Sequence, residues 1–453
     1  MRLMRGVVLV ALVAGGLGVV LPAESAEQTT IVFNGEGNRL NAYDPATGEE
    51  QTVIHSAADD EDADAPKSRS EARDINAQIC FFPDGSNRFI AGEDTAQGTD
   101  AGGPGWGIFQ LAGNKVGNLS ARQVGKLIPT FQTSDNGDEN EPYESNPENY
   151  GCGFLPDGRV VTGDVGNQYP LTPNNGQLIV WFPPFTSYEV AYCKVDIEIP
   201  TSGGIHVDDE YVYIASNRPG FPDLSRTGGI YRYKIADFPT SNTPAGGCDS
   251  ADGTGAPMTT RVEPELFITA LPGIELATPS AIVSNGKGGF YVSSVFDGRI
   301  AEYNGAGTFE RFVLQPGPGE VPPYEHGTPF GLGVGPDGTL YYANLGILLV
   351  APVPDLGTVQ RIRFDADGNP QTPEVLDEGL NFPDGIGVLV LSAPPDGAGD
   401  AAGGGPAQVK GVQVARDAST LPATGGGALP LAGLLGLGTA LAARARLRGG
   451  RGS

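Results

Sequence analysis

Short apolar runs separated by turn residues recur along most of the chain, and they predict β-strands rather than helices. Glycine and proline residues fall between these runs, and stretches with helical spacing are almost absent. The recurring unit is an apolar strand, a tight turn often reading Pro-Asp-Gly, and a second strand rich in Tyr, Val and Ile. Such turns favour hairpins, because Asp-Gly and Asn-Gly tolerate positive φ. The unit occupies residues 80–94, 152–164 and 331–344, and more loosely 204–217 and 281–294.

Four strands in each repeat predict the blades of a β-propeller. Each hairpin is followed by two further strand-like runs, at a spacing typical of propeller blades. The first runs, 29–34, 39–43 and 51–54, have no inner strand before them, and residues 382–389 supply one at the far end. We therefore predict an all-β chain, a six-bladed propeller over 27–392, closed by pairing of these distant segments. The long insertions leave seven blades as the alternative.

The charge balance restricts the partners of this chain. The 54 acidic residues outnumber the 28 basic ones, and the formal net charge is −26. A surface of this sign repels nucleic acid and anionic lipid, so no nucleic-acid partner is expected. Three long insertions are expected to be surface loops. They are the acidic stretches 58–74 and 134–149, and the Gly-rich stretch 241–257.

The N-terminal 26 residues have the three parts of a secretory signal peptide. Arg2 and Arg5 precede an apolar run over 6–21, and small residues surround Ala26. A membrane anchor is the alternative, but the run is short and Gly-rich for a spanning helix. We expect cleavage after Ala26 and export of the rest.

The C-terminus resembles a sortase sorting signal over residues 421–453. The pentapeptide precedes an apolar stretch at 428–443 and a basic tail, and its residues are Leu421, Pro422, Ala423, Thr424 and Gly425. The resemblance implies cleavage between Thr424 and Gly425 and linkage to the cell wall, with sortase and peptidoglycan as partners. The alternative is a C-terminal membrane anchor. Both interpretations place the protein outside the cell at its surface, and the Gly/Ala/Pro-rich segment 393–420 is expected to be a flexible stalk.

Four cysteines in an exported chain suggest two disulfides. They are Cys80, Cys152, Cys193 and Cys248. Three pairings are possible, and their places in the repeat favour Cys80 with Cys152 and Cys193 with Cys248. A zinc site is not favoured, because no two cysteines have the spacing of a metal knuckle.

The repeats resemble the six-bladed propellers of the NHL and gluconolactonase/regucalcin-like group. Phe382-Pro383-Asp384-Gly385-Ile386 and Thr328-Pro329-Phe330-Gly331-Leu332 are similar to that group's inner-strand starts. For lactonase members, the resemblance implies a divalent metal held by a Glu-Gly-Pro glutamate, two asparagines and an aspartate. Asp384 matches the aspartate, whereas the chain has no Glu-Gly-Pro and carries Phe330 where an asparagine is expected.

A second set of oxygen-bearing side chains comes at the ends of the second strands. We expect them on the same face as the inner-strand starts, where together with Asp384 they form a candidate site for Ca²⁺ or a sugar, and Ca²⁺ is the one cofactor that the pattern suggests. The alternative is that these side chains fix loops through backbone hydrogen bonds. The candidate ligands are Asp384, Glu93, Asp164, Asn217 and Asn344.

Two hypotheses about function follow from these observations. The first is an exported, surface-attached recognition module for an unknown extracellular ligand. The second is a divergent metal-dependent lactonase or esterase using Asp384. A quinoprotein-like dehydrogenase ranks below both, because Trp106 and Trp181 are too few and too scattered to surround such a cofactor. The sequence alone does not decide whether the protein is an enzyme.

Overall fold

The computed structural model describes the chain from residue 28 to residue 392, with gaps. The described residues are 28–36, 39–55, 75–93, 105–127, 149–164, 177–187, 189–195, 203–216, 228–251, 255–259, 262–271, 275–348 and 351–392. The predicted signal peptide, stalk and sorting signal lie outside them. No helix among the described residues is both long and apolar enough to cross a membrane.

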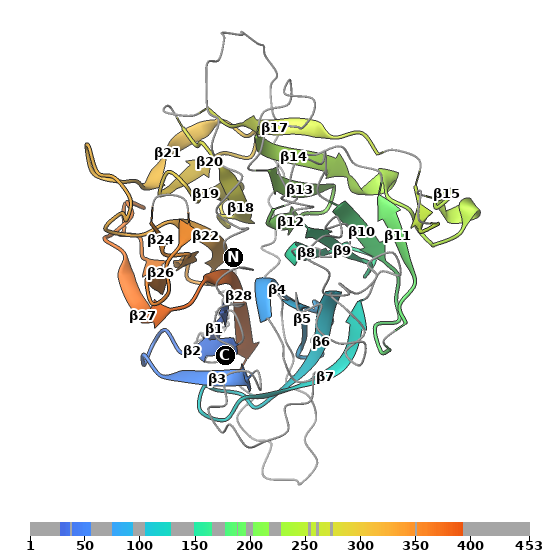
Figure 1. Cartoon of the computed structure of the whole chain (residues 1–453), viewed down its shortest axis with the longest axis horizontal. Helices are drawn as coiled ribbons and strands as arrows, with labels where there is room; N and C mark the ends of the chain where they lie inside the picture. The colour runs from blue at the N-terminus through green and yellow to red at the C-terminus, as the bar shows by residue number, and fades with distance from the viewer. Residues whose placement is uncertain are drawn as a thin grey trace, which may run out of the picture.

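Six four-stranded antiparallel units surround a central axis, which confirms the predicted propeller (Figure 1). From the inner strand outward, blade 1 consists of β28 (Pro383–Ser392), β1 (Gln28–Glu36), β2 (Arg39–Tyr43) and β3 (Glu50–His55). Blade 2, in the same order, is β4 (Ile75–Phe81), β5 (Arg88–Glu93), β6 (Gly105–Ala112) and β7 (Ser120–Leu127). Blade 3 is β8 (Asn149–Phe154), β9 (Val160–Asp164), β10 (Gln177–Trp181) and β11 (Tyr192–Val195).

Blades 4 to 6 complete the ring. Blade 4 is β12 (Ile205–Val207), β13 (Tyr211–Ser216), β14 (Gly229–Lys234) and β17 (Glu265–Thr269). Blade 5 is β18 (Pro279–Ser284), β19 (Phe290–Ser294), β20 (Arg299–Tyr303) and β21 (Phe309–Leu314). Blade 6 is β22 (Pro329–Val334), β23 (Leu340–Asn344), β26 (Gly357–Ile362) and β27 (Glu374–Leu380), and the short pair β24 (Ile347–Leu348) and β25 (Ala351–Pro352) lies in its β23–β26 connection. We call the face where the inner strands begin the top face, and the opposite one the bottom face.

The ring closes through the first and last strands, as the sequence predicted. β28 pairs antiparallel with β1 from Gln28 opposite Ser392 to Glu36 opposite Pro383. Because alternate residues of a strand point to opposite faces, β1 contributes to two cores. Ile31 and Phe33 pack toward blade 2, and Val32 packs toward blade 6. The segment that completes blade 1 therefore joins both neighbouring blades.

Six hydrophobic clusters fill the spaces between adjacent blades. The blades are consequently buried on both faces, which explains why the strands read as apolar runs rather than as strictly alternating sequences. Large aromatic side chains supply much of this core, and Trp181, Tyr233, Tyr291 and Tyr342 are fully buried. Burial of apolar surface stabilises such a core by about 25 cal/mol per Å².

Arginines at the bottom face connect each of three blades to the next one. Arg88 of blade 2 donates to the carbonyl oxygen of Phe185 in blade 3, over 3.1 Å. Arg159 of blade 3 donates to the carbonyl of Pro239 in blade 4, and Arg361 of blade 6 donates to that of Pro45 in blade 1. Each carbonyl lies in a turn between the two outer strands of its blade, so the bottom face is braced around the ring.

Both disulfides join the cysteines that the sequence favoured. Cys80 of β4 is bonded to Cys152 of β8, linking two inner strands. Cys193 of β11 is bonded to Cys248, which lies in the connection between β14 and β17. Two covalent links between consecutive blades thus supplement the apolar packing.

The insertion at 241–257 is more ordered than the predicted surface loop. The β14–β17 connection contains η3 (Ile235–Asp237), η4 (Pro244–Gly246), β15 (Ser250–Ala251) and β16 (Pro257–Met258). β16 pairs parallel with β11, which extends the sheet of blade 3 to six strands. The Cys193–Cys248 disulfide and a hydrogen bond from Arg159 also join this β14–β17 connection to blade 3. The connection therefore braces blades 3 and 4.

Candidate functional site at the axis

The inner strands approach one another closely because glycines lie where neighbouring inner strands meet. A Cβ atom on Gly385 of β28 would lie 1.5 Å from the carbonyl oxygen of Ala77 in β4. On Gly331 of β22, a Cβ would lie 2.3 Å from the carbonyl oxygen of Asp384. No side chain fits at either position without moving the backbone. The glycines therefore narrow the channel on the side formed by blades 1, 2 and 6.

Gln78 closes the opposite side of the axis with hydrogen bonds to two neighbouring inner strands. Its Nε2 donates to the carbonyl of Ile205 in β12 over 2.9 Å. Its Oε1 accepts the backbone N–H groups of Cys152 in β8 at 3.2 Å and of Ile205 at 3.0 Å. One side chain of β4 thus satisfies backbone groups of β8 and β12, and it holds blades 2, 3 and 4 together at the centre.

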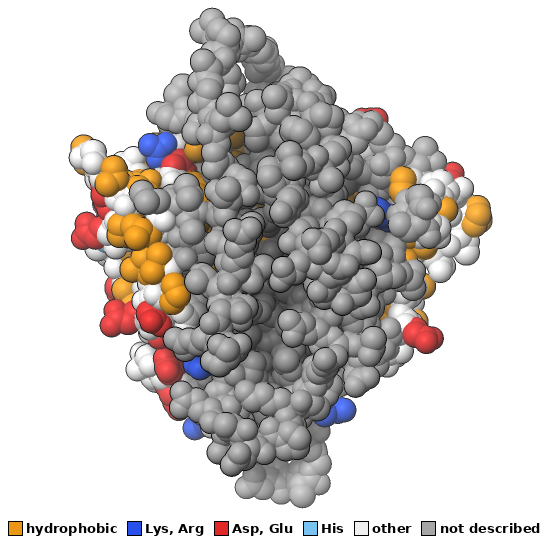
Figure 2. Space-filling model, viewed as in Figure 1, with side chains coloured by type: hydrophobic (Ala, Val, Ile, Leu, Met, Phe, Trp, Pro, Cys, Tyr) orange, Lys and Arg blue, Asp and Glu red, His pale blue; other side chains and the backbone are white. Residues whose placement is uncertain are grey.

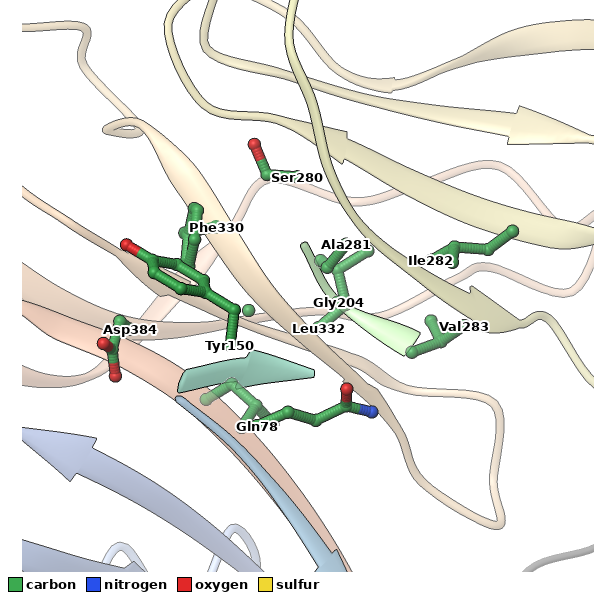
Figure 3. Close-up of a pocket in the computed structure, with 12 residues that line it drawn as sticks. Gln78, Tyr150, Gly204, Ser280, Ala281, Ile282, Val283, Phe330, Leu332 and Asp384 are labelled. Atoms are coloured by element: carbon green, nitrogen blue, oxygen red, sulfur yellow. The ribbon is translucent and has the colours of Figure 1, made fainter. Parts of the chain in front are cut away.

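The space that remains at the axis is a cavity of about 20 Å³ (Figure 3). Side chains from five of the six inner strands line it, among them Gln78, Tyr150, Ser280, Phe330 and Asp384, and Gly204 lies just before the sixth strand, β12. A volume of this size holds a water molecule or a single ion. Pockets for small organic ligands are usually several hundred Å³ in volume. As lined by the described residues, this cavity has no room for a lactone or ester substrate.

An aromatic cluster covers the cavity at the top face. Tyr150 and Phe330 are the second residues of β8 and β22, and their ring centroids are 4.9 Å apart in an edge-to-face arrangement. Phe382, immediately before β28, belongs to the same cluster. Val295 and Leu345, which follow second strands, and Ile347 of β24 complete it. The resemblance noted in the sequence implied metal ligands at inner-strand starts, and the two starts at Tyr150 and Phe330 hold aromatic side chains.

Asp384 lies beside this cluster and is almost fully buried, with 2% of its surface exposed. Its Oδ1 accepts the backbone N–H of Ala77 over 3.0 Å. Ala77 has a φ of +65°, which is uncommon for a residue other than glycine. The carboxylate therefore stabilises an unusual backbone conformation in β4 and joins β28 to blade 2. The same carboxylate borders the cavity, so Asp384 is the one candidate ligand that the structure places at the axis.

Asn344 fixes a loop, as the alternative interpretation of the second set of side chains proposed. Its Oδ1 accepts the N–H groups of Thr328 at 2.7 Å and of Gly346 at 3.0 Å. Its Nδ2 donates to the Thr358 hydroxyl at 3.0 Å. Asp297 has a similar role in blade 5, where it accepts the N–H of Ala277 over 3.1 Å. Burial raises the pKa of Asp297 above its usual range.

The side chains of the other three predicted ligands lie outside the described residues. Glu93 and Asp164 are the last residues of β5 and β9, at the top face as expected, but their side chains lie outside the described part. Asn217 follows β13 and lies outside it entirely. Within the described ranges, no three His, Cys, Asp or Glu side chains are grouped so that they could hold a metal ion. The Ca²⁺ site therefore stays a prediction.

Comparison with known proteins adds no assignment to this geometry. No family model matches the chain, and no curated protein matches it. Two solved structures are similar over most of the chain. A protein of unknown function from Bacteroides caccae has 10% identity and a TM-score of 0.40, covering 80% of this chain and 98% of its own. A luciferin-regenerating enzyme has 13% identity and a TM-score of 0.41, covering 79% and 91%. Neither likeness extends beyond the propeller architecture.

Proposed function

We propose that this protein is an exported, cell-surface-attached recognition module that binds an extracellular ligand through its top face. The observation that carries this proposal is the closed axis. Inner-strand glycines, Gln78 and the cluster of Tyr150 and Phe330 leave about 20 Å³ at the position where a propeller enzyme needs a substrate cavity. A ligand of ordinary size must then be bound on the outer surface of the molecule.

The direction of β28 favours the top face for this role. β28 begins at Pro383 on the top face and ends at Ser392 on the bottom face. The chain continues toward the predicted stalk and sorting signal from Ser392. Attachment through the C-terminus would therefore leave the top face directed away from the cell wall. The predicted partners in attachment remain sortase and peptidoglycan.

The recognition role is tested by binding of the purified, fluorescently labelled protein to arrays of glycans and extracellular proteins. We expect saturable binding to a defined class of ligand, which the unlabelled protein displaces. Removal of divalent cations by a chelator separates a Ca²⁺-dependent ligand from a Ca²⁺-independent one. Absence of saturable binding on every array, together with hydrolysis of a small substrate, would overturn the proposal.

A divergent lactonase or esterase is the second candidate, and Asp384 is the observation that favours it. A buried carboxylate that borders an axial cavity is where a hard cation would bind, because such cations prefer oxygen ligands. This function requires the aromatic cluster to move and admit a substrate. Asp384→Asn keeps the size of the side chain and removes its charge, so loss of turnover in this variant would support the enzyme.

A further inference from the structure

Two neighbouring segments of the top face expose apolar side chains. Loop 315–328 connects β21 to β22, and Val321 in this loop has 71% of its surface exposed. Leu348, in the connection between β23 and β26, is 40% exposed. Pro323 and Pro354 from the same two segments are also exposed. We call these four residues the apolar band. Figure 2 shows hydrophobic side chains along this side of the molecule, near β24 and β26 of Figure 1.

The segments that carry the apolar band are held in place by hydrogen bonds. The Glu320 carboxylate accepts the N–H groups of Gly317, at 2.6 Å, and of Glu325. Thr328 connects the two segments, because its carbonyl and its hydroxyl accept the N–H groups of Leu345 and Ile347, both at 3.2 Å. The band is thus formed before any partner arrives, which reduces the entropy lost on binding.

Acidic residues, without lysine or arginine, occur in the two segments that carry the apolar band. Residues 312–360 contain no lysine or arginine. Glu325 and Asp355 are exposed, and Glu320 is partly exposed. The backbone N–H groups of Glu325 and Gly317 lower the pKa of Glu320, so this carboxylate is ionised at neutral pH. Exposed apolar and acidic side chains therefore occur together on these two segments, and we call the acidic residues the acidic rim.

We propose that the apolar band binds a cationic polypeptide segment that carries an apolar anchor side chain. This inference rests on the proposed recognition function and names the partner class. Charge complementarity selects the partner, because the acidic rim attracts lysine and arginine. A second copy of this chain, at net charge −26, would be repelled, as would an anionic lipid surface. The apolar anchor buries Val321 and Leu348, and the cations of the segment pair with Glu325 and Asp355.

The probe is a set of fluorescent peptides of equal length, each with lysines and arginines on both sides of one apolar residue. Polylysine of the same length supplies charge without an anchor, and the acetylated peptides supply the anchor without charge. Fluorescence anisotropy with the full chain at about 0.15 M salt keeps simple long-range attraction weak. We expect binding by the complete peptides at least about tenfold tighter than by either control peptide.

Two triple variants of identical composition locate the site. Val321→Ser/Glu325→Gln/Asp355→Asn changes the apolar band and its rim, and asparagine suits the φ of +64° at position 355. Val375→Ser/Glu378→Gln/Asp367→Asn makes the same exchanges at other exposed positions, so both variants have the same net charge. We expect the first variant to bind about 10- to 30-fold more weakly and the second to match the wild type.

Equal losses in both variants would overturn the proposal, because general attraction to an acidic protein would then explain the binding. Failure of every peptide to bind at about 1 mM would also overturn it. The proposed function is tested separately by the arrays. If an array ligand binds the first triple variant as tightly as it binds the wild type, the recognition function stands and the apolar band is not its site.

Discussion

The two faces of the propeller differ in how their connections are built. At the bottom face, aspartates in the hairpin turns accept backbone N–H groups two residues onward, as Asp84 and Asp337 do at 2.9 and 3.0 Å. Arginines there reach across to the next blade. At the top face, aromatic side chains and Asp384 surround the axis, and Asn344 holds a loop. The long connections 56–74, 94–104, 128–148, 165–176, 196–202 and 217–227 all leave from strand ends at this face.

This difference between the faces supports the proposal that the bottom face stabilises the ring and the top face binds ligands. Short turns and braces at the bottom face hold the blades in register, and their sequences repeat because the geometry repeats. The top face combines an apolar centre with long connections between strands, and surface loops commonly carry binding residues on a rigid scaffold. Variants at the axis and the bottom face should therefore change stability, whereas variants on the top surface should change binding.

The largest expected effect follows from adding one methyl group at the axis. In Gly385→Ala the new Cβ overlaps the carbonyl oxygen of Ala77 at 1.5 Å, so β28 or β4 must move. We expect a loss of more than about 3 kcal/mol in the free energy of unfolding. Urea unfolding followed by fluorescence of the buried Trp106 and Trp181 measures it.

Gly317→Ala is the matched control on the top surface. Its new Cβ would meet only the Glu320 carboxylate, at an ordinary distance of 3.4 Å. We expect a change within about 0.5 kcal/mol. Similar losses in the two alanine variants would show that the axis is not closed as the structure describes.

Removing each disulfide in turn compares the stability contributed at the axis with that contributed by the brace between blades 3 and 4. They close loops of 72 and 55 residues, and the loss of chain entropy in the unfolded state corresponds to about 4 kcal/mol for each. We expect Cys80→Ala/Cys152→Ala and Cys193→Ala/Cys248→Ala to lower unfolding free energy by nearly equal amounts. If only the loss of the Cys80–Cys152 disulfide had a large effect, the stretch 241–257 in the β14–β17 connection would not brace the ring.

A smaller loss is expected at the bottom face from Arg159→Met. Arg159 is 6% exposed, and its removal leaves the carbonyls of Phe238 and Pro239 without this donor. We expect about 2 kcal/mol of destabilisation. Arg232→Met is the control, because Arg232 forms a more exposed ion pair with Glu265 and should cost at most about 1 kcal/mol. Equal effects in thermal unfolding would argue against the brace.

The smallest effect concerns pH and the closure of the ring. Glu36 is buried, and its carboxylate accepts the N–H of Asn381 at 2.8 Å. Burial raises the pKa of Glu36, while Arg39 opposes the shift and Asp377 adds to it. The folded state therefore binds a proton more readily than the unfolded chain does. This contribution to stability grows as pH falls through the raised pKa, and it is lost as pH rises again.

We expect urea unfolding between about pH 7.5 and pH 5 to show this component in the wild type and not in Glu36→Gln. Reduced repulsion among the many other carboxylates changes stability in both proteins, so the comparison isolates Glu36. Parallel pH profiles for the two proteins would assign the dependence to overall charge instead.

The sequence predicted the features that depend on local pattern. Pro-Asp-Gly turns and the runs after them predicted the blades, and the first blade's missing inner strand predicted its pairing with 382–389. Other features depend on contacts between distant residues. Gln78 is a polar residue within an apolar strand. Its hydrogen-bond partners are backbone groups of β8 and β12, and the sequence around Gln78 does not indicate them. The Gly-rich stretch 241–257 has the composition of a loop, although it pairs with β11.

The roles of the candidate metal ligands also depend on contacts that the sequence does not show. A sequence places Asn344 and Asp384 at strand ends, but the same position suits either a ligand or a loop clamp. The Asn344 Oδ1 accepts the Thr328 N–H at 2.7 Å, which favours the loop clamp at that residue. Asp384 both holds the Ala77 N–H and borders the cavity, so only an experiment on its chemistry separates the two roles.

Hydrolysis of a panel of lactones and esters, with each of several divalent cations supplied in turn, tests the closed axis most directly. The account predicts that the full chain gives no rate above background and that Asp384→Asn behaves identically. Cation-dependent turnover by the wild type that disappears in Asp384→Asn would contradict it, because such turnover requires a substrate to reach the centre of the ring.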